Sequence, residues 1–225
     1  MPKAPRSPEE IEAVKADMLG HTLDLIVEHG LEGFSMRKLA ARLNIAAKTI
    51  YNYFTNKDEM YLTIVARGFD MLFQKCREAY DDGPDPIGRL HLIARAYMDF
   101  GIENANFYNL MFTWHTPKYM DYVGTPMEPV ARIELETSLK LYGLILQATR
   151  EVAGPVVNPD DLDEEAKFYV IYFWSLLHGF IAGYNNTMLD YMHDAPLSLK
   201  EKLMETFLKN IRTEIAEWSA AKNEN

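Results

Sequence analysis

The sequence is poor in the features that define secreted and membrane proteins. Its 225 residues contain a single cysteine, Cys76, so an internal disulfide is impossible. This composition fits a reducing compartment, and we expect Cys76 to be a buried structural thiol. No run of about eighteen apolar residues is available to cross a membrane. The first ten residues have no apolar signal core. We therefore expect a cytoplasmic protein with no membrane partner.

Motifs for catalysis and metal binding are also missing. The sequence has no glycine-rich phosphate loop, no serine-nucleophile elbow and no zinc-binding spacing. Its six histidines do not pair with acids at the i, i+4 spacing of a metal site. The carboxylates of residues 160–165 indicate a solvated loop and an acidic helix start rather than a calcium loop. These absences predict that the protein is not an enzyme and holds no metal or other cofactor.

Positive charge is scarce overall, but it is concentrated near the N-terminus. The formal net charge is −10. Residues 1–57 contain eight Lys and Arg against seven Asp and Glu, whereas the rest of the chain contains fifteen against twenty-six. An acidic body would repel DNA, while a basic head could still bind phosphates. The charge distribution therefore does not exclude a nucleic-acid partner.

The stretch from Ser35 to Lys57 predicts a short basic helix-turn-helix. Ser35 is a suitable N-cap for a helix over residues 36–43, and Asn44 tolerates the positive φ of a tight turn. A second helix is expected over residues 47–54, with Ile50 facing inward. All five charged residues of the stretch are basic. Any helical protein contains short helices joined by turns, so this geometry alone leaves DNA binding open.

The order of residues in this stretch is more specific than its geometry. LAARLNIAAKTIYNYFTNKDEMYLTIV resembles the DNA-binding signature of the TetR family of bacterial regulators. Two positions depart from the pattern: Asn44 replaces the usual glycine, and Ala46 replaces a serine or threonine that would cap the second helix. The resemblance implies that the second helix enters the major groove of a double-stranded DNA operator. The expected DNA-binding residues are Ser35, Arg37, Ala47, Lys48, Thr49, Tyr51, Asn52 and Lys57.

The rest of the chain predicts further helices and no strand. We expect an all-α protein with a DNA-binding head over residues 1–58 and a helical ligand-binding and dimerisation body over residues 59–225. Helix start and stop signals and apolar periodicity place the helices. The expected helices run over residues 8–30, with Ser7 as the N-cap, and over residues 36–43, 47–54, 56–80, 86–114, 129–152, 164–186 and 199–218.

The body contains aromatic and methionine side chains suited to an apolar pocket with a few polar anchors. At any single position such a side chain is more often core than ligand contact; the family resemblance is what implies a pocket. The expected ligand-binding residues are Tyr97, Tyr108, Met111, Phe112, Trp114, His115, Trp174 and His178. The string Trp174–His178–Gly179 also resembles the Trp-x-x-x-His-Gly signature of one TetR branch.

The last two expected helices carry apolar stripes that could form a four-helix bundle across a two-fold axis. The expected dimer-interface residues are Phe180, Leu203, Phe207 and Ile211. His178 could instead lie at this interface.

Together these features predict a homodimeric, ligand-responsive transcriptional regulator. Repression of a palindromic operator, relieved by a small apolar or aromatic effector, is the default that the resemblance implies; activation stays open. The main alternative is a helical ligand-binding or adaptor dimer that has lost DNA binding, which Asn44 and Ala46 favour slightly. A small helical enzyme is a third reading and would require turnover without DNA binding.

Overall fold

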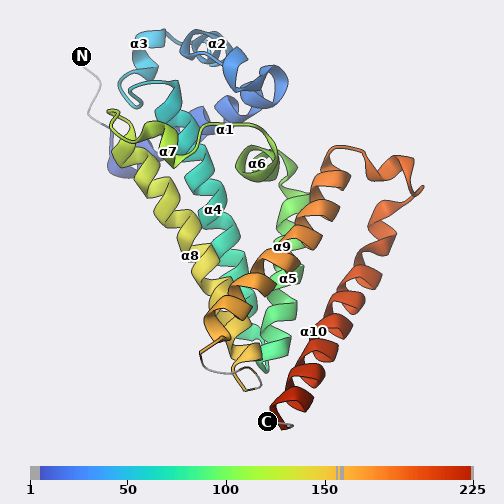
Figure 1. Ribbon diagram of the computed structural model, residues 1–225. Coiled ribbons are helices and arrows are strands. Elements are labelled where there is room, and N and C mark those ends of the chain that lie inside the picture. Colours follow the sequence, from blue (N-terminus) through green and yellow to red (C-terminus); the bar gives the residue numbers. More distant parts are fainter. Residues whose placement is uncertain (1–5, 156, 158–159, 224–225) are drawn as a thin grey trace. The chain divides into compact units, whose positions relative to one another are not determined.

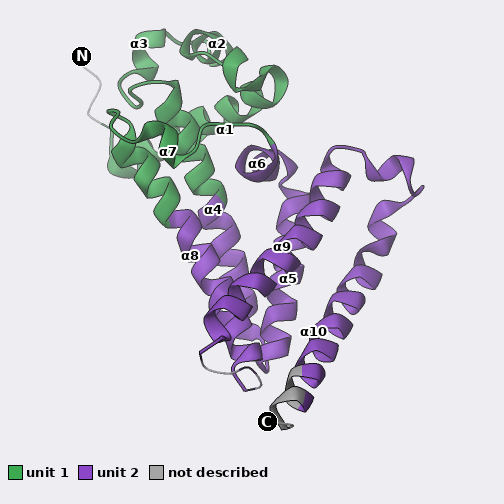
Figure 2. Cartoon of the chain, viewed as in Figure 1, with its two compact units in different colours: residues 1–68, 114–136 green, residues 69–113, 137–225 purple. Residues whose placement is uncertain are grey.

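The computed structural model describes residues 6–155, 157 and 160–223, and every regular element within these ranges is a helix (Figure 1). This confirms the all-α fold expected from the sequence. The chain divides into two compact units, one formed by residues 1–68 and 114–136 and the other by residues 69–113 and 137–225 (Figure 2). We call them the head unit and the body unit. The division into domains at residue 58 remains a proposal about function.

Helices α1, α2, α3 and α7 belong to the head unit, and α5, α6, η1, α9, η2, η3 and α10 to the body unit, while α4 and α8 each have residues in both. The bounds up to the middle of the chain are α1 Pro8–Gly33, α2 Met36–Arg42, α3 Ala47–Ile50, α4 Lys57–Asp82, α5 Pro86–Glu103, α6 Ala105–Tyr108 and the π-helix η1 Asn109–Thr113. They are followed by α7 Tyr119–Tyr122, α8 Glu128–Ala153, α9 Leu162–Asn185, the 3-10 helices η2 Leu189–Tyr191 and η3 Pro196–Leu199, and α10 Lys200–Asn223.

Side-chain caps begin several helices where the sequence predicts them. Ser7 and Glu10 form a capping box at α1, with the Ser7 Oγ accepting from the Glu10 amide at 3.2 Å. The Ser35 Oγ accepts from the Lys38 amide at 3.3 Å and begins α2. The Asp85 carboxylate accepts from the Gly88 amide at 2.8 Å and begins α5. Each cap satisfies a backbone donor that would otherwise lack a partner at the helix start.

Several segments differ from the expected helices, among them the 3-10 helices η2 and η3, which lie between two expected helices. The second helix of the helix-turn-helix ends at Ile50 instead of residue 54, and a turn follows. The helix expected over residues 86–114 breaks at Asn104, whose φ of −118° and ψ of 47° are not helical. Residues 119–122 form a short helix in a segment expected to be a loop. In each case the backbone conformation of a few residues depends on their tertiary contacts. Apolar periodicity over a longer window does not detect such a local change.

The body unit packs α5 against both α9 and α10. Gly101 allows the close approach of α5 and α9, because a Cβ atom at this position would lie 2.7 Å from Cγ2 of Ile181. Arg95 on α5 forms a two-armed ion pair with Glu201 on α10, at 2.7 and 3.1 Å. Apolar packing and paired charges thus hold these three helices together and fix the walls of the cavity described below.

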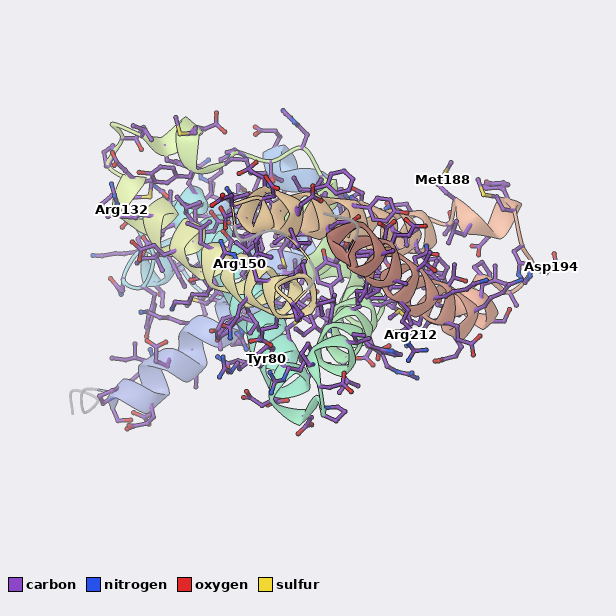
Figure 3. All side chains as sticks on the ribbon, turned by 60° about the horizontal axis from the view of Figure 1, so that its bottom comes forward. Tyr80, Arg132, Arg150, Met188, Asp194 and Arg212 are labelled. Carbon is purple, nitrogen blue, oxygen red and sulfur yellow. The ribbon has the colours of Figure 1, made fainter. Side chains whose placement is uncertain are left out.

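The side chains that reach solvent in the body unit include those of the α9–α10 connection, where Met188 and Asp194 lie (Figure 3). At the other end of the unit, Tyr80 of α4 donates to Glu151 of α8 at 2.5 Å, and Arg89 of α5 donates to the same carboxylate at 3.0 Å. This polar cluster ties three helices together. Cys76 lies in the core with no exposed surface, and burial raises the pKa of its thiol to about 12. Its surroundings are those expected of a structural cysteine.

Candidate DNA-binding face and body cavity

The helix-turn-helix is built on a buried apolar base. Leu39 of α2, Ile50 of α3 and Phe54 after it are 0%, 0% and 4% exposed. Asn44 makes the turn between the two helices with a φ of 52°, a conformation that asparagine tolerates better than most residues. Because the apolar side chains point inward, the opposite side of α3 is left to polar and aromatic residues.

The structure exposes four of the eight predicted DNA-binding residues on the surface of the head unit. Arg37, Lys48, Tyr51 and Asn52 are exposed, and Tyr51 is 55% exposed despite its aromatic ring. The remaining predicted residues, Ser35, Ala47, Thr49 and Lys57, are half-buried. An exposed aromatic ring beside a lysine and an asparagine is suited to contact both phosphate and base edges.

The basic residues of the motif differ in how they are engaged. Lys38 donates to the Gly33 carbonyl at 2.7 Å, Arg42 pairs with Glu28 at 2.5 Å, and Lys57 lies 3.7 Å from Glu32. Within the described part of the chain, no ion pair engages Arg37 or Lys48. These two cations are therefore the ones most directly available to phosphate. Lys57 could exchange partners at little cost, because the Glu32 side chain is 94% exposed and exposed pairs contribute little.

The first turn of α3 has no side-chain cap. Ala46 occupies the N-cap position with the extended backbone typical of that site, φ −68° and ψ 138°, but its methyl group cannot accept a hydrogen bond. The sequence-level expectation that Ala46 removes a cap is thus confirmed. The Thr49 amide donates to the Ala46 carbonyl at 2.8 Å, and the amides before it in the helix remain available to solvent or to another acceptor.

The body unit encloses an apolar cavity of about 270 Å³. Its walls come from Phe69 in the middle of α4, from α5, η1, α8 and α9, and from Phe207 of α10. No charged side chain lines it. The lining residues are Phe69, Leu90, Ile93, Ala94, Tyr97, Phe112, Ser138, Leu141, Tyr142, Ile145, Thr149, Val170, Ile171, Phe173, Trp174, Leu177 and Phe207.

Three of the eight predicted ligand-binding residues line this cavity: Tyr97, Phe112 and Trp174. Tyr108 and His178 lie behind its wall, where their rings contact that of Phe112 at 4.9 and 6.4 Å between centroids. Met111 is buried in η1 but is not part of the lining. Trp114 and His115 belong to the head unit, so the structure does not bring them to this cavity within the body unit.

Sequence reasoning missed most of the aliphatic wall. The α8 contribution, for example, consists of Ser138, Leu141, Tyr142, Ile145 and Thr149. These positions have helical spacing, and the apolar ones among them could be predicted to face inward. Periodicity identifies the inward face but does not show whether that face meets a packed neighbour or a void, so no local signal distinguished cavity wall from core.

A chain of hydrogen bonds runs along one side of the cavity. The Trp174 indole N–H donates to the Tyr97 hydroxyl at 2.8 Å, the Tyr97 and Tyr108 hydroxyls lie 3.1 Å apart, and the Tyr108 hydroxyl lies 2.9 Å from Nδ1 of His178. The indole can only donate. If Tyr97 donates to Tyr108 and Tyr108 donates to His178, every hydroxyl proton has an acceptor; the reverse order would strand the proton of Tyr97, which is 3% exposed.

This direction makes His178 a neutral acceptor at Nδ1, with its proton on Nε2. Burial lowers the pKa of His178 below its ordinary value, which favours the same neutral form. Burial also raises the pKa of Tyr97 and of Tyr108 well above that of a free phenol. All four groups are thus uncharged near neutral pH, and the indole N–H, the two hydroxyls and Nδ1 of His178 are occupied by one another.

The predicted dimer residues lie in different environments. Phe207 and Ile211 are 1% and 2% exposed within the single chain, and the Phe207 ring contacts that of Phe173 at 4.5 Å. They belong to the core of the body unit, so the prediction that they form a surface for a second subunit is corrected. Leu203 and Phe180 are half-buried. The stripe read from the sequence was apolar because it packs inside the protomer.

A helix-turn-helix head and a larger helical body with its own cavity define the class of two-domain helical regulators. The chain belongs to the TetR family. Residues 19–64 match the family described as bacterial regulatory proteins, tetR family, and residues 90–207 match the tetracyclin repressor-like C-terminal domain. The more specific branch with the Trp-x-x-x-His-Gly signature remains a prediction.

Individual relatives are distant. The HTH-type transcriptional activator FasR of Mycolicibacterium smegmatis is 27% identical over 114 residues, which are 51% of this chain and 49% of FasR. The chain therefore spans about half the length of this curated relative. The solved structure of the regulatory protein SCO4313 has a TM-score of 0.70 at 22% identity, covering 92% of this chain and 98% of the other. That of the fatty acid degradation regulator FadR from Bacillus halodurans has a TM-score of 0.63 at 16% identity, covering 91% and 97%.

None of the described helices is long and apolar enough to cross a membrane. Among the same residues, no group of three or more His, Cys, Asp or Glu side chains could hold a metal ion.

Proposed function

We propose that the chain is a ligand-responsive transcriptional regulator that acts in the cytoplasm as a homodimer on a palindromic DNA operator. The observation that carries this proposal is the outer side of the helix-turn-helix, where Lys48, Tyr51 and Asn52 are exposed above the buried Ile50. The second helix would enter the major groove, with half-sites about one helical turn apart, roughly 34 Å. Arg37 and Lys48 would bind phosphates, and Asn52 would read a base edge.

One exposed face, on α9, supports the homodimer. On α9, Phe168 and Tyr172 are 57% and 47% exposed. Ser175 and Gly179 continue the same face at helical spacing, and a Cβ atom added to Gly179 would meet nothing within 4 Å. Large apolar side chains next to small residues would allow a second copy of α9 to pack closely. We therefore place the proposed dimer surface on this side of α9.

The cavity supports an effector that is largely apolar. Such a ligand would favour one of two conformations of the dimer, and it would change operator affinity only to the extent that it binds the two conformations differently. FadR is described as a regulator of fatty acid degradation. An apolar effector of this chain would resemble a fatty acid in having a hydrocarbon body. We propose that the protein is a repressor and that effector binding releases it from its operator.

The proposal is tested by measuring, with fluorescence anisotropy at several salt concentrations, how tightly the protein binds the DNA that flanks its own gene. Asn52→Ala should relax the preference for the operator over unrelated DNA, by about 1–3 kcal/mol. Lys48→Ala should weaken binding to both DNAs alike and reduce the salt slope by about one. An adaptor that has lost DNA binding would show no salt-dependent binding to either DNA, and that result would refute the proposed function.

A further inference from the structure

The chemistry of the cavity wall specifies its occupant more closely than apolarity alone. Five of its lining residues carry a polar side-chain atom: Tyr97, Ser138, Tyr142, Thr149 and Trp174. The polar atoms of Tyr97 and Trp174 are bonded to each other at 2.8 Å, and the Thr149 hydroxyl donates to the Ile145 carbonyl at 2.9 Å. Ser138 also has a partner within the protein. The polar groups of the inner wall are thus already engaged.

Tyr142 differs from the other four because, among the described residues, its hydroxyl has no hydrogen-bond partner. It is 39% exposed, and the two other lining residues with large exposed fractions are Ile171, at 63%, and Trp174, at 38%. The cavity therefore opens between α8 and α9, and the Tyr142 phenol is positioned where a ligand would enter. A polar group on a ligand could meet this hydroxyl or solvent at the mouth but would find no free partner further in.

We propose that the cavity selects a hydrocarbon body without hydrogen-bonding groups, on a ligand whose polar end stays at the mouth beside Tyr142. This inference rests on the proposed function for its biological meaning, but it concerns binding to the protein alone. The Trp174–Tyr97–Tyr108–His178 chain acts as the filter. It removes the polar wall atoms from the reach of a ligand, so a hydroxyl or carbonyl carried into the interior loses its water without gaining a partner.

The filter also predicts how it can be disabled. In Tyr97→Phe, the Trp174 indole N–H loses its acceptor and becomes a free donor at the cavity wall, while the ring that shapes the wall remains. Tyr108 still has His178 as its acceptor, because their bond does not involve Tyr97. The variant should therefore accept ligands with an interior oxygen that the native protein rejects.

Isothermal titration calorimetry of the full chain without DNA tests the inference. The probes are decanol, a decanol that carries a second hydroxyl in mid-chain, and decahydronaphthol as a fused-ring hydrocarbon. The native protein should bind decanol or decahydronaphthol, and whichever binds more tightly identifies a linear or a fused-ring body. The mid-chain hydroxyl should weaken decanol binding about ten-fold or more, since it is buried without a partner.

Tyr97→Phe should reduce that penalty to within about three-fold, because its free indole donor can serve the added hydroxyl. The matched control is Tyr169→Phe, which removes a phenol on α9 that donates to Glu214 at 2.7 Å and does not line the cavity. It should keep the full penalty. Thermal unfolding of both variants shows whether a change in binding reflects a change in folding.

A second pair of variants tests whether the probes bind inside the cavity. Leu141→Phe fills part of the lining and should weaken decanol binding at least ten-fold, whereas Leu139→Phe, on the exposed side of the same helix, should leave it unchanged. If Leu141→Phe does not fold, Leu177→Phe on the opposite wall makes the same test.

The inference is overturned if none of the probes binds, if the mid-chain hydroxyl has no effect, or if Tyr97→Phe and Tyr169→Phe behave alike. None of these outcomes depends on operator binding. Conversely, loss of DNA binding would refute the regulator function while leaving the selectivity of the cavity intact.

Discussion

At the scale of single residues, His178 makes the stability of the fold depend on pH. The pKa of His178 is lowered from 6.5 by burial, so between the lowered value and 6.5 the unfolded chain takes up the proton more readily than the folded one. Its contribution to stability is therefore complete above pH 6.5 and decreases as the pH falls below it. Protonation would also put a hydrogen on Nδ1 and remove the acceptor that Tyr108 uses.

We accordingly expect the melting temperature of the native protein to fall as the pH drops below about 6.5, and His178→Asn to reduce that slope. Thermal unfolding at a series of pH values measures both. His91 on α5 also has a lowered pKa, because of burial and the nearby charge of Arg95. At pH values above the range in which carboxylates titrate, part of the slope should therefore persist in the variant and disappear in His91→Asn combined with it. An unchanged slope in His178→Asn would show that the polar chain does not require a neutral imidazole.

Single side chains also explain what could not be predicted at the cavity. Tyr97 and Trp174 were expected to contact a ligand, and they do line the cavity, but their polar atoms are engaged with each other. That pairing joins residues 77 positions apart in the chain. Local sequence therefore indicated an aromatic body, whereas the direction of the hydrogen bonds, and with it the selectivity, arises only from the fold.

At the scale of helices, start signals were the most predictable feature and short helices the least. Ser7, Ser35 and Asp85 accept hydrogen bonds from their helix starts, and the first two caps were predicted because a cap acts over only three residues. The end of α3 at Ile50 and the break at Asn104 were not predicted. A four-residue helix has too few positions to show a period, and a break inside an apolar stretch leaves the average pattern unchanged.

The missing cap of α3 yields a prediction at this scale. Ala46→Ser would place a hydroxyl at an N-cap whose extended backbone already suits it, and it should stabilise the head unit by about 1 kcal/mol. Urea unfolding measures the gain. Ala41→Ser is the control, because it introduces the same side chain at an exposed position inside α2, where serine is slightly unfavourable. Equal effects of the two substitutions would mean that the start of α3 does not behave as a helix N-terminus.

At the scale of the whole molecule, the exposed apolar surface of α9 indicates that another subunit packs against it. Contiguous exposed apolar side chains are uncommon on monomers, and the Phe168 and Tyr172 rings stack on each other with centroids 6.2 Å apart at the surface. The sequence predicted dimerisation through the last helices but placed it partly on Phe207 and Ile211, which the single chain buries. An apolar stripe on a helix does not reveal whether it packs inside one subunit or between two; only burial in the folded chain separates the two cases.

This distinction predicts opposite outcomes for two charged substitutions. Phe168→Asp places a carboxylate on the exposed face of α9, outside the cavity lining. It should convert a dimer into a folded monomer of unchanged cavity affinity and weaker operator binding, because one head per molecule can engage only one half-site. Phe207→Asp should instead unfold the body unit, since a buried charge without a partner costs several kcal/mol. Light scattering with circular dichroism separates the two, and Met120→Asp, on an exposed residue of the head unit, controls for added charge. A Phe168→Asp protein that remains dimeric would place the subunit contact elsewhere, and a folded monomer of Phe207→Asp would restore the interface first read from the sequence.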